Sequence, residues 1–247
     1  MTTVDSSGYA PEWLRLREPA DAAARAGSLA ARLPAGTETV IRDLGCGTGS
    51  MTRWLAGRLP LPQHWILHDR DPLLLEIAVS NLPARVTAEA RTGDLTQLSD
   101  FTQTTLVTAS ALLDLLTAQE VRRLVNACVE AGCPALLTLS VTGDVEITPA
   151  EPADGALLEA FNDHQRRESR LGPDAAVFAV REFESRGWTV HTRHSPWRLG
   201  STQDALIRAW YHGFTTAARE QNRRLPVPGE RTITAVTVHH LDLLALP

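Results

Sequence analysis

Residues 43–49 read Asp-Leu-Gly-Cys-Gly-Thr-Gly and stand between two segments of different periodicity. The stretch TVIRDL, residues 39–44, predicts a strand, and residues 50–58 follow with a helical pattern. Glycine tolerates positive φ and lets a ligand approach the main chain closely. This strand–loop–helix unit therefore predicts a ligand site at the carboxyl end of the strand, and a glycine-rich turn without a ligand is the alternative.

Strand-like and helical segments alternate on both sides of this loop. That alternation predicts a mainly parallel sheet with helices on both faces. Further strands are predicted at residues 64–68, 86–90, 105–109, 135–141 and 188–195, with a closing strand or two within 233–246. Helices are predicted at 11–33 (interrupted at Pro19), 72–82, 117–131, near 154–170 and 174–186, and at 201–222, whereas 142–153 reads as a polar, proline-bearing loop.

Composition excludes several classes of protein. The 247 residues carry a formal net charge of −5, which disfavours nucleic acid as a partner because a nucleic-acid-binding surface is basic. No apolar run is long enough to span a bilayer, and the N-terminus lacks the pattern of a signal peptide, so we expect a cytoplasmic protein that binds no membrane. All 24 basic residues are Arg, which indicates a GC-rich bacterial genome.

The three cysteines form no metal-binding or disulfide pattern. Cys46, Cys128 and Cys133 are odd in number, and none belongs to a CxxC pair or neighbours a His at ligand spacing. The sequence therefore predicts three free, mostly buried thiols and no metal site.

Asp43 and the glycines at positions 45, 47 and 49 resemble motif I of class I S-adenosylmethionine-dependent methyltransferases, of the bacterial small-molecule type. A dinucleotide-binding loop reads G-x-G-x-x-G/A, and this chain has Ser50 where the third small residue belongs. The ligand of the methyltransferases has no pyrophosphate. The resemblance therefore implies a loop that wraps the methionine and ribose portions of the cofactor.

Two more segments resemble the same family. Residues 69–78, D-x-D-P-x-x-L-x-x-A, are similar to its D-x-S-P-x-x-L-x-x-A, with Asp71 in place of Ser. The resemblance implies that Asp69 accepts hydrogen bonds from the ribose hydroxyls, while Asp71 is expected to cap the next helix; the alternative is that both only cap it. Residues 91–95, RTGDL, resemble a segment whose aspartate, here Asp94, accepts from the adenine amine, and a plain turn is the alternative.

The resemblance extends over about residues 38–145, because residues 108–116 are similar to the loop that lines the methyl-transfer site in this family. It implies an α/β, Rossmann-like, doubly wound sheet of seven strands with a helical N-terminal or insert cap. It also implies an enzyme whose cofactor is S-adenosylmethionine, with S-adenosylhomocysteine as product.

We expect one domain, residues 1–247, with a helical lead-in or lid (1–37), a cofactor-binding core (38–145) and substrate-side helices and closing strands (146–247). The implied cofactor-binding residues are Asp43, Gly45, Cys46, Gly47, Thr48, Gly49, Asp69, Arg70, Gly93, Asp94, Leu95 and Ser110.

Asp114 and His164 are the candidate catalytic residues. Methyl transfer requires a nucleophile held in line and, for some acceptors, a base. Asp114 follows the fourth strand, where a carboxylate suits that role, although it is equally expected to cap a helix beginning near Leu115. His164 ends an apolar helical stripe that includes Phe161 and has the pKa nearest neutrality, so we favour His164; an ordinary partly buried histidine is the alternative.

Aromatic and Arg side chains near the two ends of the chain are candidates for acceptor binding. They either close a lid over a small molecule or belong to the core and surface. The candidate substrate-binding residues are Trp13, Arg17, Asp114, His164, Trp197 and Tyr211.

The function predicted from these observations is methyl transfer to a small-molecule acceptor, with oxygen favoured over nitrogen or carbon. Residues 110–113 read SALL and not the [DNS]-P-P-[YFW] of base-amine methyltransferases. An RNA or protein methyltransferase of the same fold and a non-catalytic S-adenosylmethionine sensor are the alternatives. An NAD-dependent reductase is disfavoured by the position of Gly49.

Overall fold

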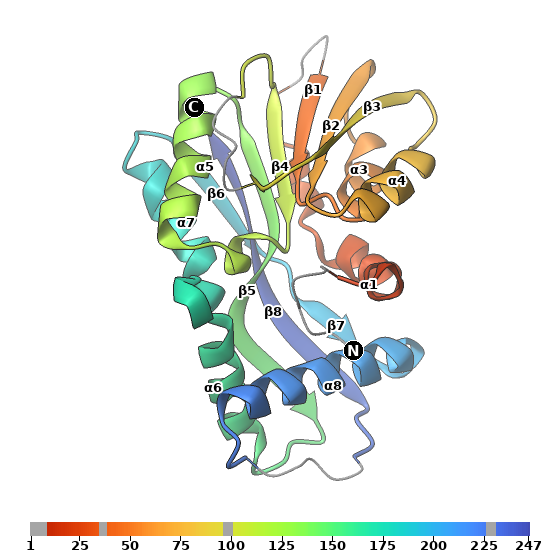
Figure 1. Cartoon of the computed structure of the whole chain (residues 1–247), viewed down its shortest axis with the longest axis vertical. Helices are drawn as coiled ribbons and strands as arrows, with labels where there is room; N and C mark the ends of the chain where they lie inside the picture. The colour runs from red at the N-terminus through yellow and green to blue at the C-terminus, as the bar shows by residue number, and fades with distance from the viewer. Residues whose placement is uncertain (1–8, 35–38, 96–100, 226–230) are drawn as a thin grey trace.

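Eight strands of the described residues form one sheet in the order β3-β2-β1-β4-β5-β8-β6, with β7 beside β8 (Figure 1). The structure, a computed structural model, describes residues 9–34, 39–95, 101–225 and 231–247. The strands β1 to β5 run parallel, and β8 alone runs antiparallel to its neighbours. The strand bounds are β1 Thr39–Leu44, β2 Gln63–Asp69, β3 Val86–Thr92, β4 Leu106–Ser110, β5 Ala135–Thr148, β6 Thr189–His194, β7 Trp197–Leu199 and β8 Ala235–Leu246.

Helices cover both faces of this sheet, which confirms the predicted doubly wound α/β fold. One face buries Ile41 and Trp65 under α2, α3 and α4, and the other buries Val107 and Leu137 under α5 and α7. The helix bounds are α1 Pro11–Ala24, α2 Gly27–Ala30, α3 Ser50–Ala56, α4 Pro72–Ser80, α5 Ala118–Ala131, α6 Asp154–Gln165, α7 Ala175–Glu184 and α8 Asp204–Gln221, with short 3-10 turns at η2 Leu113–Leu115, η3 Arg167–Ser169, η4 Gly172–Asp174 and η5 Ser201–Gln203.

The lower half of the molecule in Figure 1 is built on β5 and β8, which continue together beyond the other strands. The prediction of a loop over residues 142–153 was wrong in this respect, because β5 runs on to Thr148. Val145 and Ile147 alternate with polar residues, pair with β8 and pack under α6 and α8 in a separate core cluster. Packing in this cluster holds α6 and α8 against the extension of β5 and β8, beside the carboxyl end of β4.

Three further features differ from the sequence prediction: the course of the first helix, the number of strands and the end of α6. The helix α1 passes through Pro19 without ending, and the Arg17–Asp21 ion pair spans the proline. The sheet has eight strands and not seven, because β8 is long enough to pair with β6 and with the short β7. The predicted helix near 154–170 ends at Gln165, since Glu168 and Ser169 have positive φ.

Local capping follows the sequence closely. Asp71 accepts a hydrogen bond from Leu73 N and caps α4, which confirms its expected role. Thr117 and Glu120 form a capping box at the start of α5, so Asp114 does not cap that helix. The cysteines at 46, 128 and 133 are free and buried, as predicted. Among the described residues, no helix has the length and apolarity needed to cross a bilayer.

Candidate functional site

The glycine loop turns sharply between β1 and α3. Gly47 and Gly49 have φ values of 54° and 85°, a region that other residues rarely adopt. A Cβ on Gly47 would lie 3.2 Å from Leu14, and one on Gly49 would lie 3.2 Å from the Cβ of Ala78 in α4. Glycine at these positions therefore permits both the turn and the close packing of α1 and α4 around it.

Asp69, at the end of β2, holds this loop in place. Its Oδ2 atom accepts a hydrogen bond from Gly47 N at 2.9 Å, and its Oδ1 atom accepts one from Asp71 N at 3.0 Å. A carboxylate has about four acceptor positions, so two remain after these bonds. Asp69 therefore orients the loop and can still accept from two vicinal hydroxyls.

Asp43, at the end of β1, is almost completely buried beside the same loop. Its Oδ1 atom accepts from Thr108 at 2.7 Å, whereas no described residue supplies a partner for the buried Oδ2 atom. Burial raises the pKa of Asp43 to about 7, and the bond from Thr108 opposes that rise. An orphaned carboxylate oxygen of this kind suits a cationic group on a ligand.

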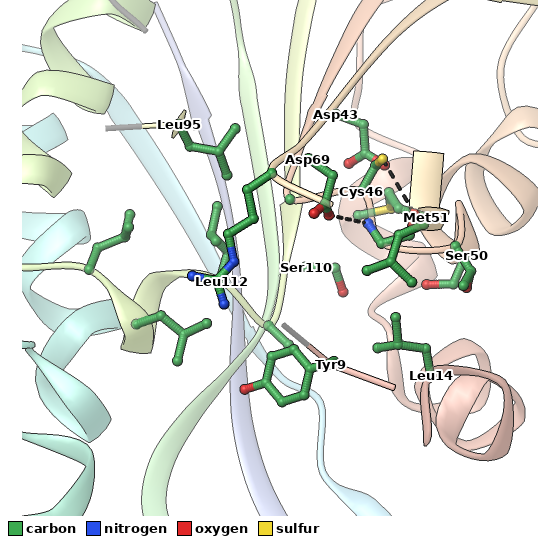
Figure 2. A pocket seen from close by; sticks show the side chains of 18 of the residues that line it. Tyr9, Leu14, Asp43, Cys46, Ser50, Met51, Asp69, Leu95, Ser110 and Leu112 are labelled. Carbon is green, nitrogen blue, oxygen red and sulfur yellow. Dashed lines mark hydrogen bonds between the residues drawn. The ribbon is translucent and has the colours of Figure 1, made fainter. Parts of the chain in front are cut away.

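These groups line a cavity of about 440 Å³, which we call the first cavity (Figure 2). In Figure 2, Asp43, Cys46 and Asp69 lie at the carboxyl ends of the strands, and Tyr9 and Leu14 lie across the cavity from them. The predicted cofactor residues that line it are Asp43, Gly45, Cys46, Gly47, Thr48, Asp69, Arg70, Gly93, Asp94, Leu95 and Ser110. Gly49 is the exception, because it lies behind the loop against α4.

The N-terminal segment supplies lining residues that sequence reasoning missed. Tyr9, Leu14 and Asp21 face the first cavity, and burial raises the pKa of Tyr9 to about 12, so its hydroxyl stays protonated. Nearby, Arg25 is buried and donates to Ser50 Oγ at 2.9 Å and to Ser110 Oγ at 3.0 Å. None of these positions belongs to a local motif, so only the amphipathic pattern of the lead-in could have indicated them.

Helix α1 is held by hydrogen bonds to α3 and to β7. Arg53 of α3 donates to both carboxylate oxygens of Glu18, at 2.7 and 2.6 Å. Asp21 accepts from Arg17 and, at 3.0 Å, from the indole nitrogen of Trp197 in β7. These contacts fix α1 between the first cavity and the lower half of the molecule.

A second cavity of about 350 Å³ lies beside the first, and Tyr9, Arg17, Ala111, Leu115 and Arg170 line both. Its floor is the β5–β8 pair, and its walls come from α1, α6 and α8. Five of the six predicted acceptor residues line it: Trp13, Arg17, Asp114, His164 and Trp197. Tyr211 does not, because it faces the other side of α8, where Arg231 lies over its ring.

The two candidate catalytic residues differ in their surroundings within the second cavity. The Oδ1 atom of Asp114 is buried without a partner among the described residues, and burial raises the pKa of this carboxyl. His164 lies 3.2 Å from Glu220; partial burial lowers the pKa of His164, and Glu220 opposes that fall. Asp114 is flanked by Leu115, which lines both cavities, whereas His164 lies on α6.

The arginines that follow α6 pair mainly with protein groups. Arg166 donates to Asp174 at 2.8 Å, and Arg167 donates to Gln221 at 2.7 Å. Arg170, near the carboxylate of Glu168, lines both cavities.

Comparison with known proteins identifies the core. Residues 41–134 match the family described as a methyltransferase domain. The match covers the cofactor-side core and not the rest of the chain. The match confirms the predicted enzyme class. A search of curated proteins finds no match.

Solved structures resemble the whole chain in fold. YcgJ from Bacillus subtilis is 14% identical with a TM-score of 0.55, and the alignment covers 89% of this chain and 96% of that one. A complex of DhpI with SAH is 12% identical with a TM-score of 0.50, over 96% of this chain and 86% of DhpI. At such identities the likeness concerns the fold, and it extends well beyond the matched residues 41–134.

Proposed function

We propose that this chain is a cytoplasmic bacterial enzyme that transfers a methyl group from S-adenosylmethionine to a small-molecule acceptor, with oxygen favoured over nitrogen or carbon. The observation that carries the proposal is the junction of two cavities at Tyr9, Arg17, Ala111, Leu115 and Arg170. One cavity carries the polar groups that suit the cofactor, and the other is lined in part by aromatic rings. We infer a single domain in which residues 146–247 supply most of the acceptor side.

The first cavity fits the cofactor on several independent grounds. The orphaned Oδ2 of Asp43 suits the ammonium of the methionine portion, and the free acceptor positions of Asp69 suit the ribose hydroxyls. Asp94 lines the cavity after β3, where it suits the adenine amine. When bound, the cofactor supplies an electrophilic methyl group.

The chain's own contribution to the reaction is positioning and proton removal. The second cavity holds the acceptor beside Leu115 and Ala111, so its reactive atom faces the first cavity. Asp114, next to this junction, is placed to take the proton of an acceptor hydroxyl, and its raised pKa makes it a stronger base than an exposed aspartate. His164 is the second candidate for this step.

Isotope-labelled methyl transfer into fractionated metabolites of the source cell tests the proposal. We expect label from S-adenosylmethionine to appear in a small-molecule fraction. Label found only in RNA or protein would contradict the acceptor class, and binding without turnover to S-adenosylhomocysteine would indicate a sensor.

A further inference from the structure

The second cavity contains three buried polar atoms for which no described residue supplies a hydrogen-bond partner. They are Asp114 Oδ1, Gln165 Oε1 and His240 Nδ1, from η2, α6 and β8. Buried polar atoms in proteins are almost always paired, and each one left unpaired costs about 1–3 kcal/mol. Three such atoms around one cavity indicate that a ligand satisfies them.

All three atoms can accept a hydrogen bond. The oxygens of Asp114 and Gln165 are acceptors by their chemistry. His240 is only 3% exposed, and burial lowers the pKa of its imidazole to about 3, so the ring is neutral and one of its nitrogens is an acceptor. Arg17 further disfavours protonation of His240, and hydrogen bonding to the backbone at Ser195 and Val238 opposes that effect. The matching ligand therefore donates hydrogen bonds.

Aromatic rings from α1, α6, α8 and β7 line part of the remaining surface of the cavity. Trp210 stacks on Phe214 with ring centroids 5.1 Å apart, and Phe161 contacts Phe214 at 5.0 Å. Trp13 and Trp197 stand on the α1 side, each near the guanidinium of Arg17. Ring surfaces of this kind favour a planar aromatic ligand, which can stack on them or contact their edges.

Charge selects a neutral ligand. Three arginines (17, 167 and 170) and three carboxylates (114, 168 and 220) line the cavity, so it carries no excess charge. Each arginine also has a carboxylate partner: Asp21 for Arg17, Glu220 for Arg167 and Glu168 for Arg170. An anionic phosphate therefore finds no arginine without a carboxylate here. The one lining carboxylate without an ion pair, Asp114, is under the electrostatic influence of both Arg17 and Arg170, which disfavours a quaternary ammonium beside it.

We propose that the second cavity binds a neutral aromatic compound of one or two rings that carries at least two hydrogen-bond-donating substituents, a polyhydroxylated aromatic. The inference rests on the proposed function, because it names the acceptor class of the same site. A volume of about 350 Å³ lies at the small end of the range for ligand cavities, which suits a ligand of this size.

Binding of matched naphthalene probes tests this inference without any turnover. The probes are 2,7-dihydroxynaphthalene, 2,7-dimethoxynaphthalene, 2-naphthyl phosphate and 2-naphthyl trimethylammonium, each titrated into the full chain by calorimetry and by quenching of tryptophan fluorescence. We expect the dihydroxy compound to bind at least tenfold more tightly than each of the others. Equal or tighter binding of any other probe, or no binding of the dihydroxy compound, would overturn the inference.

Gln165→Leu supplies a second readout, and Gln119→Leu on the exposed face of α5 is its matched control. Gln165→Leu removes an orphaned acceptor, so we expect about tenfold weaker binding of the dihydroxy probe, unchanged binding of the dimethoxy probe and no loss of thermal stability in the ligand-free protein. Gln119→Leu should leave both affinities unchanged. Unaltered binding of the dihydroxy probe to Gln165→Leu would contradict the assignment.

A parallel titration with S-adenosylmethionine separates the two proposals. Binding of S-adenosylmethionine without binding of the dihydroxy probe would overturn only the acceptor class. Failure of S-adenosylmethionine to bind would overturn the proposed function itself.

Discussion

Asp69 Oδ2 accepts a hydrogen bond from Gly47 N at 2.9 Å, which ties the end of β2 to the glycine loop that follows β1. The two residues are 22 positions apart, yet both line the first cavity. The same carboxylate accepts from Asp71 N, so it is fully oriented before any ligand binds. A ligand that uses its remaining acceptor positions meets a preorganised group, which reduces the entropic cost of binding.

Replacement of Asp69 should therefore weaken cofactor binding far more than replacement of its neighbour. Asp69→Ala removes the ribose acceptor and the bond to Gly47. We expect calorimetry to show that S-adenosylmethionine binds about tenfold more weakly, or weaker still. Asp71→Ala removes only the cap of α4, with an expected cost of about 1 kcal/mol in unfolding free energy and little change in affinity. Equal losses of affinity would show that the ribose role belongs to neither residue specifically.

The glycine loop allows a matched test of backbone strain. Gly49→Ala places a Cβ at φ 85° and 3.2 Å from Ala78, so we expect urea unfolding to show a loss of about 1–2 kcal/mol or more. Gly57→Ala, at the end of α3, has φ −73° and no atom within 4 Å of the added carbon, and it should be neutral or slightly stabilising. If Gly49→Ala proves as stable as Gly57→Ala, close packing of α3 on α4 does not require glycine.

Asp43 should make cofactor binding depend on pH. Its pKa of about 7 means that it is ionised only above neutrality in the ligand-free protein, and a cationic ligand group needs the ionised form. We expect the Kd of S-adenosylmethionine to rise as pH falls from 7.5 to 5.5, by at most about tenfold per pH unit below the pKa. Asp43→Asn should bind more weakly and with a flatter profile. A steep profile that persists in Asp43→Asn would assign the titration to another group.

The same carboxyl affects stability in the opposite direction. Its pKa is about 7 in the folded chain against 3.8 for an ordinary aspartate, so the folded state holds this proton over a range where the unfolded state has lost it. The protonated Asp43 carboxyl therefore makes its full contribution to the free energy of unfolding below about pH 4. That contribution is lost as pH rises through about 7. Chemical unfolding of Asp43→Asn and the parent chain across this range should show a smaller slope in the variant.

The proposed base is tested by conservative variants of the two candidates. Asp114→Asn keeps the shape but removes the basic oxygen, and we expect kcat to fall about 10²–10⁴-fold with cofactor affinity nearly unchanged, because Asp114 lines only the second cavity. His164→Gln should lower kcat less than tenfold. The reverse order of effects, together with loss of a pH dependence below the ordinary pKa range of histidine, would assign the base to His164.

The sequence predicted the parts of the fold that depend on local pattern. The glycine loop, Asp69 and the capping Asp71 lie in short motifs, because the turn at the carboxyl end of a parallel strand constrains neighbouring residues directly. Tyr9 and Arg25 reach the site from the N-terminal segment through tertiary packing, and no local pattern marks them.

The extension of β5 was missed for a different reason. Gly143 and Pro149 are residue types that favour turns, and the segment was therefore predicted to be a loop. The alternation of Val145 and Ile147 with polar neighbours, which is typical of a strand, was given less weight. Pairing with β8 decides this segment, and that partner lies about 90 residues further along the chain. The same long-range pairing creates the floor of the second cavity, which explains why the cofactor side was easier to predict than the acceptor side.

The most direct test of the central claim is calorimetric titration of the purified chain with S-adenosylmethionine, S-adenosylhomocysteine, NAD and NADP. The polar groups of the first cavity match the two sulfur compounds, and Ser50 takes the position that a pyrophosphate-binding loop gives to its third small residue. We expect S-adenosylmethionine and S-adenosylhomocysteine to bind at a single site and both nicotinamide cofactors to give no heat of binding. Tight binding of NAD or NADP with no binding of either sulfur compound would contradict the account.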